Sequence, residues 1–516
     1  MKNKKTDELN ISINQDFPVE IIKLADKISK FSVIPFIGAG CSKAILDGND
    51  WEGITNATAA ELGLTDWSGL EPTDLAERFA NKFGKAALYN LLEKKLTLRV
   101  FDDVRGCTHL AIMSLHFTTI YTTNIDNVLE LACSKYNRPL QIVSRLEDLH
   151  KIMPGITTLY KYHGCLSQPS TIVWTSTDYR QRQNEYNYFL NVRLRSDLLT
   201  KTFLFIGYSL SDPHIISILK QMQNLYTNGI RKSIVIAVGD YKKFREKLTI
   251  DGLDIEVIAP AEIFPNLDPN SAWSYFLSLL AKKVYLNFNE TQLINMFDTS
   301  RYQPQRLICD YELKLLEQCY SELPLANAIA LFRSKLDACF IHSDLNSRVA
   351  ELVVNIIKRA HEEPFDYLQL AGLIGNLCLT KESMLYIYSH ACTLLATEID
   401  QSFSIFIKLP DDTNLKFTIV CRAAQILIDS KKVLNANFIN WVAHQYDLDK
   451  TTFEKLPIDL QGQVRFIYNQ IFSQSPLTNP ITMVKSRLPG YRTRSELLDS
   501  MIKSLPHQIS KPNDQL

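Results

Sequence analysis

This sequence lacks several features that would point to particular protein classes. Its ten cysteines form no CxxC pair, which disfavours a zinc site built from adjacent cysteine pairs. No apolar run approaches the roughly 18 residues of a membrane-spanning helix, and the polar N-terminus has no signal-peptide core. Basic and acidic residues number 56 each, so the charge excess of many nucleic-acid-binding proteins is missing. We therefore expect a cytoplasmic protein with no membrane segment and no direct contact with nucleic acid.

The sequence does contain two differently patterned parts, and 516 residues exceed the size of one comfortable core. From 18 to 288, short β-branched or aromatic runs alternate with helical periodicity, which predicts an α/β domain with a Rossmann-like doubly wound parallel sheet. From 289 to 505, apolar residues recur every three or four positions, which predicts an all-α domain of about eight to ten helices. A polar arm, 1–17, and a tail, 506–516, flank these two domains. The strand candidates are 31–37, 117–123, 157–163, 202–208, 233–239 and 254–260.

Pro35 is unusual inside the first predicted strand. Proline has no N–H to donate to the ladder of hydrogen bonds in a sheet. We expect the strand to be bulged at this point or to lack a neighbour on one side.

Glycine and polar residues follow the predicted strands, and ligands bind beyond the carboxyl ends of strands in doubly wound sheets. The first strand runs into GAGCS, 38–42, whose glycines either let a phosphate approach backbone N–H groups or serve only a turn. The second runs into TTNID, 122–126, where Asn124 and Asp126 offer an amide and a carboxylate. Asp126 equally fits a helix N-cap.

Three further strand ends carry candidate residues. His163 follows the third strand in YHG; a lone histidine is usually structural, but its pKa suits a general base near neutral pH. The fourth strand precedes GYSLSDP, 207–213, where Asp212 before Pro213 also fits the start of a helix. The fifth ends in Gly239-Asp240, which suits either a ribose contact or a turn. Five successive strand ends with such residues favour a nucleotide site.

The motifs GAGCS, TTNID, YHG and GYSLSDP, in this order, resemble those of the sirtuin superfamily of NAD-consuming enzymes. The resemblance covers about residues 18–265. It implies that Asn124 and Asp126 face the nicotinamide ribose and that His163 is the catalytic base. The residues to which it assigns contacts with NAD+ are Gly38, Ala39, Gly40, Ser42, Thr123, Gly207, Ser209, Asp212 and Gly239.

Departures from the superfamily pattern narrow the resemblance. Protein-deacylating sirtuins carry a zinc ribbon with two CxxC pairs after the catalytic histidine, whereas here Cys165 is the sole cysteine between 163 and 207. The PDFR-like sequence after GAGxS is replaced by GNDWEGI, 48–54, and Thr123 stands in place of the usual glutamine. The chain thus resembles the zinc-ribbon-less sirtuin-like NADase domains of bacterial antiphage defence systems.

This resemblance implies an NAD glycohydrolase that cleaves NAD+ to nicotinamide and ADP-ribose, with NAD+ as substrate and no zinc. It further implies a gated effector of abortive infection, in which the helical domain regulates or oligomerises. We expect a homo-oligomer and a partner or phage-derived trigger, such as a HerA-type ATPase or a nucleotide-sensing subunit. Two alternatives stay open: an NAD-dependent protein deacylase or ADP-ribosyltransferase, and a non-catalytic subunit that senses NAD or ADP-ribose.

Overall fold

The structure is a computed structural model, and it divides the chain into two compact units, residues 1–384 and 385–516. Each unit is considered by itself. The predicted N-terminal arm before Phe17, the predicted tail and most of the predicted helices beyond 395 lie outside the described residues. The structure describes residues 17–184, 188–225, 232–288, 306–336, 339–362, 370, 373–374, 376–395 and 458.

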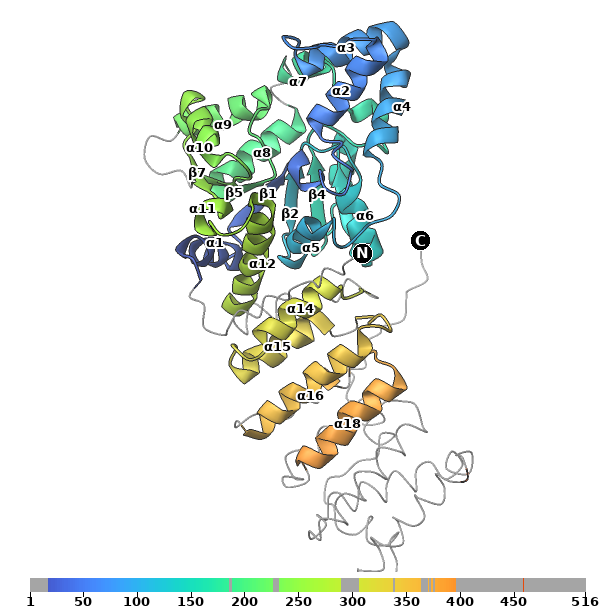
Figure 1. The fold of residues 1–516 in the computed structure, drawn as a ribbon, viewed down its shortest axis with the longest axis vertical. Coiled ribbons are helices and arrows are strands. Elements are labelled where there is room, and N and C mark those ends of the chain that lie inside the picture. The colour runs from blue at the N-terminus through green and yellow to red at the C-terminus, as the bar shows by residue number, and fades with distance from the viewer. Residues whose placement is uncertain are drawn as a thin grey trace, which may run out of the picture. The chain divides into compact units, whose positions relative to one another are not determined.

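A seven-stranded, all-parallel sheet forms the centre of the first unit, in the order β3-β4-β2-β1-β5-β6-β7. Helices flank this sheet (Figure 1), as the doubly wound fold class predicted from the sequence requires. That prediction is confirmed. The strands are β1 (Val33–Ile37), β2 (Thr119–Thr122), β3 (Leu140–Val143), β4 (Thr157–Lys161), β5 (Thr202–Ile206), β6 (Ser233–Ile236) and β7 (Ile255–Ile258).

The two faces of the sheet are set by the alternation of side chains along each strand. Phe36, Tyr121 and Phe205 belong to one core cluster, together with apolar residues of the helices that pack on that face. These helices are α8 (Phe189–Thr200), α9 (Pro213–Leu225) and α10 (Tyr241–Ile250). The neighbouring residues Ile37 and Thr122 point to the opposite face, where they line a cavity beside helix α6 (Val128–Lys135).

The opposite face is covered by helices from distant parts of the sequence. Helix α12 packs against α1 and α5, and α5 packs against α6. These helices are α1 (Val19–Ser29), α5 (Cys107–Ser114), α6 (Val128–Lys135) and α12 (Pro269–Asn287), which follows the short helix α11 (Pro260–Ile263).

An insertion of helices follows β1 and gathers with α7 in Figure 1. Helix α3 packs against α2, α4 and α7, and the Trp51 and Trp174 rings lie 4.3 Å apart between their centroids. A hydrogen bond of 3.0 Å from the Thr177 backbone N–H to the Glu77 carboxylate also joins α7 to the insertion. These helices are α2 (Trp51–Leu62), α3 (Pro72–Phe83), α4 (Lys85–Leu96) and α7 (Ser176–Asn184).

Pro35 lies where one of its two sides has no paired neighbour. Opposite Pro35, β1 is aligned with Leu204 of β5, while the pairing of β1 with β2 begins only at Phe36. The prediction of a bulge or a missing neighbouring strand is met only in part, because β1 has a strand on each side and Pro35 is left unpaired on the β2 side alone. One strand, β3, was not predicted from the sequence. It has only four half-buried residues, LQIV, which are too few to show the alternation of apolar and polar residues that marks a strand.

Helices continue after the sheet domain. They are α14 (Asp310–Cys319), α15 (Leu325–Leu336), α16 (Asn346–Glu362) and α18 (Lys381–Leu395). Helix α14 packs against α5 and α12, so the start of the predicted helical domain contacts the sheet domain within the first unit. The boundary near residue 288 stays a prediction. Within the described ranges, no helix has the length and apolarity needed to cross a membrane.

Candidate functional site

The predicted motifs meet because their strands are neighbours. All strands are parallel, so their carboxyl ends share one edge of the sheet, and β4, β2, β1 and β5 are adjacent there. The loops that follow these strands begin at Tyr162, Thr123, Gly38 and Gly207, respectively. Gly239, predicted to contact NAD+, follows β6 and lies one strand further out.

The loop after β1 interlocks with the loop after β5. The Gly38 and Gly40 N–H groups each donate a 2.9 Å hydrogen bond, to the carbonyl oxygens of Ile206 and Gly207. A Cβ atom at Gly38 would lie 2.4 Å from the Gly207 carbonyl oxygen, and one at Gly40 2.8 Å from it. Gly207 has φ of +62°, and a Cβ there would lie 2.6 Å from the Cys41 nitrogen. This backbone contact requires glycine at all three positions; their contact with NAD+, and that of half-buried Ala39, stay predictions.

Ser42, Asn124 and Asp126 come together at the ends of β1 and β2. The Asn124 amide donates to the Ser42 hydroxyl at 3.4 Å. Both groups also interact with the buried Asp126 carboxyl and favour its ionised form, against the effect of burial. Asp126 also accepts a 3.1 Å hydrogen bond from the Val128 N–H at the start of α6. The N-cap position of α6 is Asn127 rather than Asp126, although Asp126 does bond the first N–H of the helix, and the catalytic role of Asp126 stays a prediction.

His109 joins this cluster and was missed from the sequence. It lies on α5, is 1% exposed, and its Nε2 lies 3.5 Å from the Ser42 hydroxyl. Burial lowers the pKa of His109 to about 4, so the ring is neutral near pH 7. Its other ring nitrogen, Nδ1, is buried without a hydrogen-bond partner. No motif marked this position, because His109 lies within an apolar helical run far from any predicted strand end.

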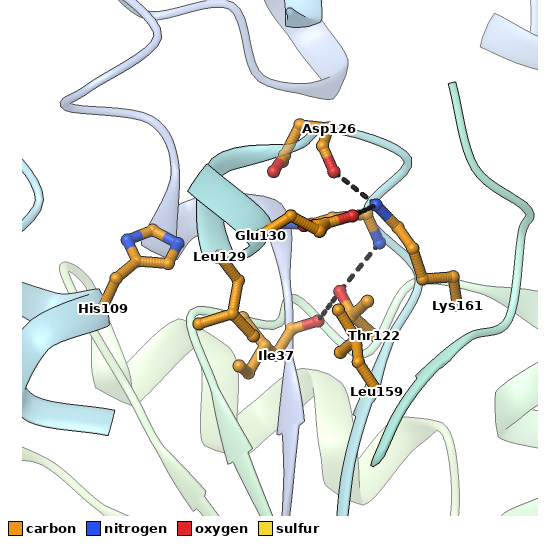
Figure 2. A pocket seen from close by; sticks show the side chains of 9 residues that line it. Ile37, His109, Thr122, Asp126, Leu129, Glu130, Leu159 and Lys161 are labelled. Atoms are coloured by element: carbon orange, nitrogen blue, oxygen red, sulfur yellow. Dashed lines mark hydrogen bonds and ion pairs between the residues drawn. The ribbon is translucent and has the colours of Figure 1, made fainter. Parts of the chain in front are cut away.

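A small cavity opens below the TTNID loop, on the α5 and α6 side of the sheet (Figure 2). His109, Asn124 and Asp126 line it, and the enclosed space is about the size of one water molecule. Its remaining lining residues are Ile37, Thr122, Leu129, Glu130, Leu159 and Lys161.

A buried cation lies at the floor of this cavity. Lys161, the last residue of β4, is 1% exposed and forms an ion pair with Glu130 of α6. Burial raises the pKa of Asp126 above its usual range, and the positive charge of Lys161 limits that rise. The pocket thus combines a desolvated carboxyl with one compensating cation.

His163 belongs to a second cluster, beside the loop after β5. Its Nε2 lies 3.0 Å from the Asp212 carboxylate, and its Nδ1 lies 3.4 Å from the Tyr179 hydroxyl of α7. The His163 side chain is 4% exposed, so it is held by protein groups on both ring nitrogens. The structure pairs His163 with Asp212 rather than with Asn124 or Asp126.

The two carboxylate oxygens of Asp212 contact different groups. One oxygen accepts hydrogen bonds of 2.8 and 3.2 Å from the His214 and Ile215 N–H groups, which caps α9 as its sequence suggested. The other faces His163. Burial opposes ionisation, but the His163 ring and the two N–H groups outweigh it and hold the pKa of Asp212 below its usual value.

The other residues predicted to contact NAD+ lie near these clusters. Ser209 is exposed, and its carbonyl accepts a 3.0 Å hydrogen bond from Lys247 of α10. The half-buried Thr123 interacts with the buried Tyr208 hydroxyl. In the part of the chain that the structure describes, no three His, Cys, Asp or Glu side chains are arranged to hold a metal ion.

Comparison with known proteins agrees with this arrangement. Residues 118–258 match the SIR2-like domain family, a range that holds the motifs after β2, β4 and β5 but not GAGCS. The chain is 29% identical over 211 residues to NAD(+) hydrolase ThsA of Enterococcus faecium, covering 40% of this chain and 43% of that protein. It is 27% identical over 199 residues to NAD(+) hydrolase ThsA of Bacillus cereus, covering 38% and 41%.

A similar match extends to a protein with a different name. The chain is 25% identical over 226 residues to Defense-associated sirtuin 2 of Bacillus subtilis, covering 42% of this chain and 22% of that protein. The match therefore spans less than half the length of each of these three relatives. The chain contains a sirtuin-like domain, similar over about two fifths of its length to proteins named as NAD(+) hydrolases and as a defence-associated sirtuin.

Proposed function

We propose that this chain hydrolyses NAD+ to nicotinamide and ADP-ribose. One observation carries the proposal: the Ser42–Asn124–Asp126 cluster and the His163–Asp212 pair lie on loops of adjacent strands at one edge of the sheet. The names of the relatives, NAD(+) hydrolase ThsA among them, support the same reaction.

Asp126 supplies the electrostatic term in this proposal. Nicotinamide leaves as a neutral molecule, so positive charge develops on the ribose as the N-glycosidic bond breaks, as in other glycoside cleavages. A desolvated carboxylate stabilises such a charge more strongly than it would in water. Asp126 is 8% exposed; burial raises its pKa, and the nearby charge of Lys161 opposes that rise and favours the carboxylate form.

Asn124 and His163 complete the chemistry. The Asn124 side-chain amide, which donates to Ser42, positions a ribose hydroxyl or the attacking water; the Asn124 backbone N–H is fixed separately by a 2.9 Å hydrogen bond to the Thr122 hydroxyl. His163 accepts the proton from that group. Its Nε2 faces Asp212 at 3.0 Å, so in this proposal the proton goes to Nδ1, and the substrate replaces the 3.4 Å contact between Nδ1 and the Tyr179 hydroxyl.

Nicotinamide release from NAD+ by the purified full chain tests this assignment. His163→Ala and Asn124→Ala are each expected to lower the rate at least about 100-fold, in the range seen for loss of general bases and positioning groups. The matched control is His150→Ala, because His150 is exposed on another segment, the 3₁₀ helix Leu146–Lys151. Unchanged release in either active-site variant contradicts the residue assignment.

The reaction mixture also separates the alternatives. Release that requires an acetylated peptide indicates a deacylase, and transfer of ADP-ribose to protein indicates a transferase. Binding of NAD+ without release, under all conditions tested, indicates a sensing subunit.

We further propose that the hydrolase is a gated, cytoplasmic effector of antiphage defence, since unregulated NAD+ loss would harm the host cell. The helical region, 289–505, is proposed to regulate the site or to form a homo-oligomer, with a partner protein or phage-derived trigger. The word "Defense-associated" in a relative's name supports this setting. Adding lysate of phage-infected cells is expected to raise nicotinamide release above that with uninfected lysate; equal release contradicts gating by infection.

A further inference from the structure

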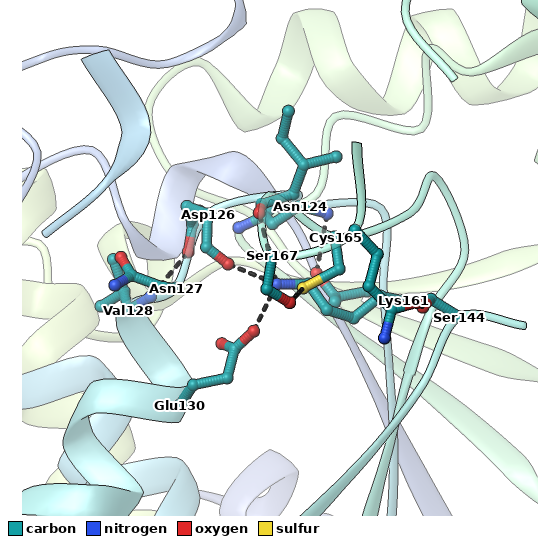
Figure 3. Close-up of polar contacts among 12 residues, drawn as sticks. Asn124, Asp126, Asn127, Val128, Glu130, Ser144, Lys161, Cys165 and Ser167 are labelled. Carbon is teal, nitrogen blue, oxygen red and sulfur yellow. Dashed lines mark hydrogen bonds and ion pairs between the residues drawn. The ribbon is translucent and has the colours of Figure 1, made fainter. Parts of the chain in front are cut away.

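Lys161 makes its contacts with the backbone of the TTNID loop as well as with a carboxylate. Its ammonium donates to the carbonyl oxygen of Ile125 at 3.4 Å. It also donates to the carbonyl oxygen of Asp126 and pairs with Glu130 (Figure 2). Figure 3 draws Lys161 and Glu130 among the polar groups around Asn124 and Asp126. All three contacts lie inside the protein, because Lys161 is 1% exposed.

A buried lysine at this place is not explained by stability. Removing an ammonium from water costs several kcal/mol, which a partner carboxylate recovers only with good geometry, so an apolar side chain of similar length is often as stable. Burial alone would lower the pKa of Lys161, but Glu130 and Asp126 outweigh it and keep the side chain charged. The charge therefore has a task that an apolar residue does not perform.

That task is visible in what the ammonium contacts. Two successive carbonyl groups, of Ile125 and Asp126, turn toward it and fix the peptide planes that follow Asn124. Two residues after Lys161, the same chain segment reaches His163, which faces Asp212. Lys161 thus joins the loop that carries the amide and carboxylate to the strand that carries the histidine.

We propose that Lys161 is a positioning residue that holds the TTNID loop against the end of β4. It thereby keeps Asn124 and Asp126 at a fixed position relative to His163. This inference rests on the proposed NAD+ hydrolysis. Lys161 itself contacts no reacting atom; it acts through the backbone of residues 125 and 126 and through Glu130.

The electrostatic surroundings of Asp126 give the proposal a second observable. The groups around Asp126 come from four elements. They are Lys161 of β4, His109 of α5, Glu130 of α6, and Cys41 and Ser42 of the loop after β1. His109 is neutral and burial raises the pKa of the Cys41 thiol, so Lys161 is the cation in this set. Its loss is expected to raise the pKa of Asp126 further and to move the acid limb of the pH–rate profile to higher pH.

The test compares Lys161→Met, which keeps the length of the side chain without its charge, with Lys135→Met. Lys135 is a matched control, because it is a half-exposed lysine of α6 that pairs with Asp103 at 2.9 Å. Lys161→Met is expected to lower kcat for nicotinamide release about 100-fold with KM within about 3-fold, the pattern of misplaced catalytic groups. Glu130→Gln keeps the ammonium and its carbonyl partners and is expected to lower kcat about 10-fold, which also covers the case that Lys161→Met does not fold.

Hydrogen exchange of the backbone amides in 123–128 provides a readout that needs no activity. In Lys161→Met, or in Glu130→Gln if the former does not fold, faster exchange in this segment together with the kcat loss supports the proposal. A kcat loss with wild-type exchange, or wild-type values of both, overturns it. If wild-type protein releases no nicotinamide, the proposed function fails on that result, and faster or unchanged exchange still decides whether Lys161 positions the loop.

Discussion

The interlocked glycines after β1 and β5 allow two costs of replacing glycine to be separated. Gly239 has φ of +80° with no atom within 4 Å of an added Cβ, so Gly239→Ala meets only the left-handed backbone cost of about 1–2 kcal/mol. Gly38 has an ordinary φ of −112°, but an added Cβ would lie 2.4 Å from the Gly207 carbonyl oxygen. Gly38→Ala therefore meets only the steric cost, about 1–3 kcal/mol for forced movement in a packed region.

Gly207→Ala meets both costs, because its φ is +62° and its Cβ would lie 2.6 Å from the Cys41 nitrogen. We expect its free energy of unfolding to fall by about 2–5 kcal/mol, the sum of the two ranges. Urea unfolding followed by tryptophan fluorescence measures the three variants against wild type; Trp51 begins α2, and Trp174, whose ring packs on it, lies just before α7. The expected order of stability is Gly239→Ala above Gly207→Ala, with Gly38→Ala clearly below wild type.

The reasoning is refuted by one combination of results. If Gly38→Ala unfolds at the urea concentration of wild type and loses only NAD+ binding, the glycine is needed for ligand approach and not for the backbone contact. Loss of stability together with loss of binding supports the interlocked loops as the reason for the GAG sequence.

Two further predictions concern buried carboxylates. Glu312 is fully buried against Arg138, and Arg306 and Lys335 help to lower its pKa to about 2, so Glu312→Gln is expected to cost about 3–5 kcal/mol of unfolding free energy in thermal or urea unfolding. Because the pKa of Glu312 is lower in the folded than in the unfolded protein, this stabilisation is complete above about pH 4.5 and is lost as pH falls toward about 2. A difference in unfolding free energy between wild type and variant that stays constant between these pH values contradicts the prediction. Asp212→Asn is expected to lower kcat for nicotinamide release more than KM rises, because Asp212 orients His163 rather than holding substrate; a pure KM effect, measured in the same assay, favours the NAD+ contact predicted from the sequence.

Much of the sheet followed from the sequence because its strands are apolar and fully buried. Runs such as VIPFI and TFLFI stand out from any helical periodicity, and the parallel order places their ends at one edge. The half-buried β3 gave no such signal. An unpaired side at Pro35 could be predicted because the absence of an N–H is a property of the residue itself, although β1 proved to have a strand on each side.

The site followed from the sequence only where a residue lies next to a strand end. Ser42 was predicted only as a contact of NAD+, and it lies beside Asn124 and Asp126, which were predicted to face the nicotinamide ribose. The partners of these residues were not accessible, because His109 comes from a helix and Asp212 was read as a contact of NAD+ rather than of His163. Pairwise contacts between segments depend on packing, which strand and turn patterns do not encode.

The most direct test of the proposed hydrolase is the simultaneous measurement of nicotinamide and ADP-ribose formed from NAD+ by wild-type protein and by Asp126→Asn. The variant keeps the size of the buried side chain and its contact with the Val128 N–H but removes the negative charge. We expect wild-type protein to form one ADP-ribose for each nicotinamide, both in the presence and in the absence of lysate of infected cells, although the lysate raises the rate. We expect Asp126→Asn to form neither product. Equal product formation by the two proteins, or binding of NAD+ without either product in any condition, contradicts hydrolysis at this site.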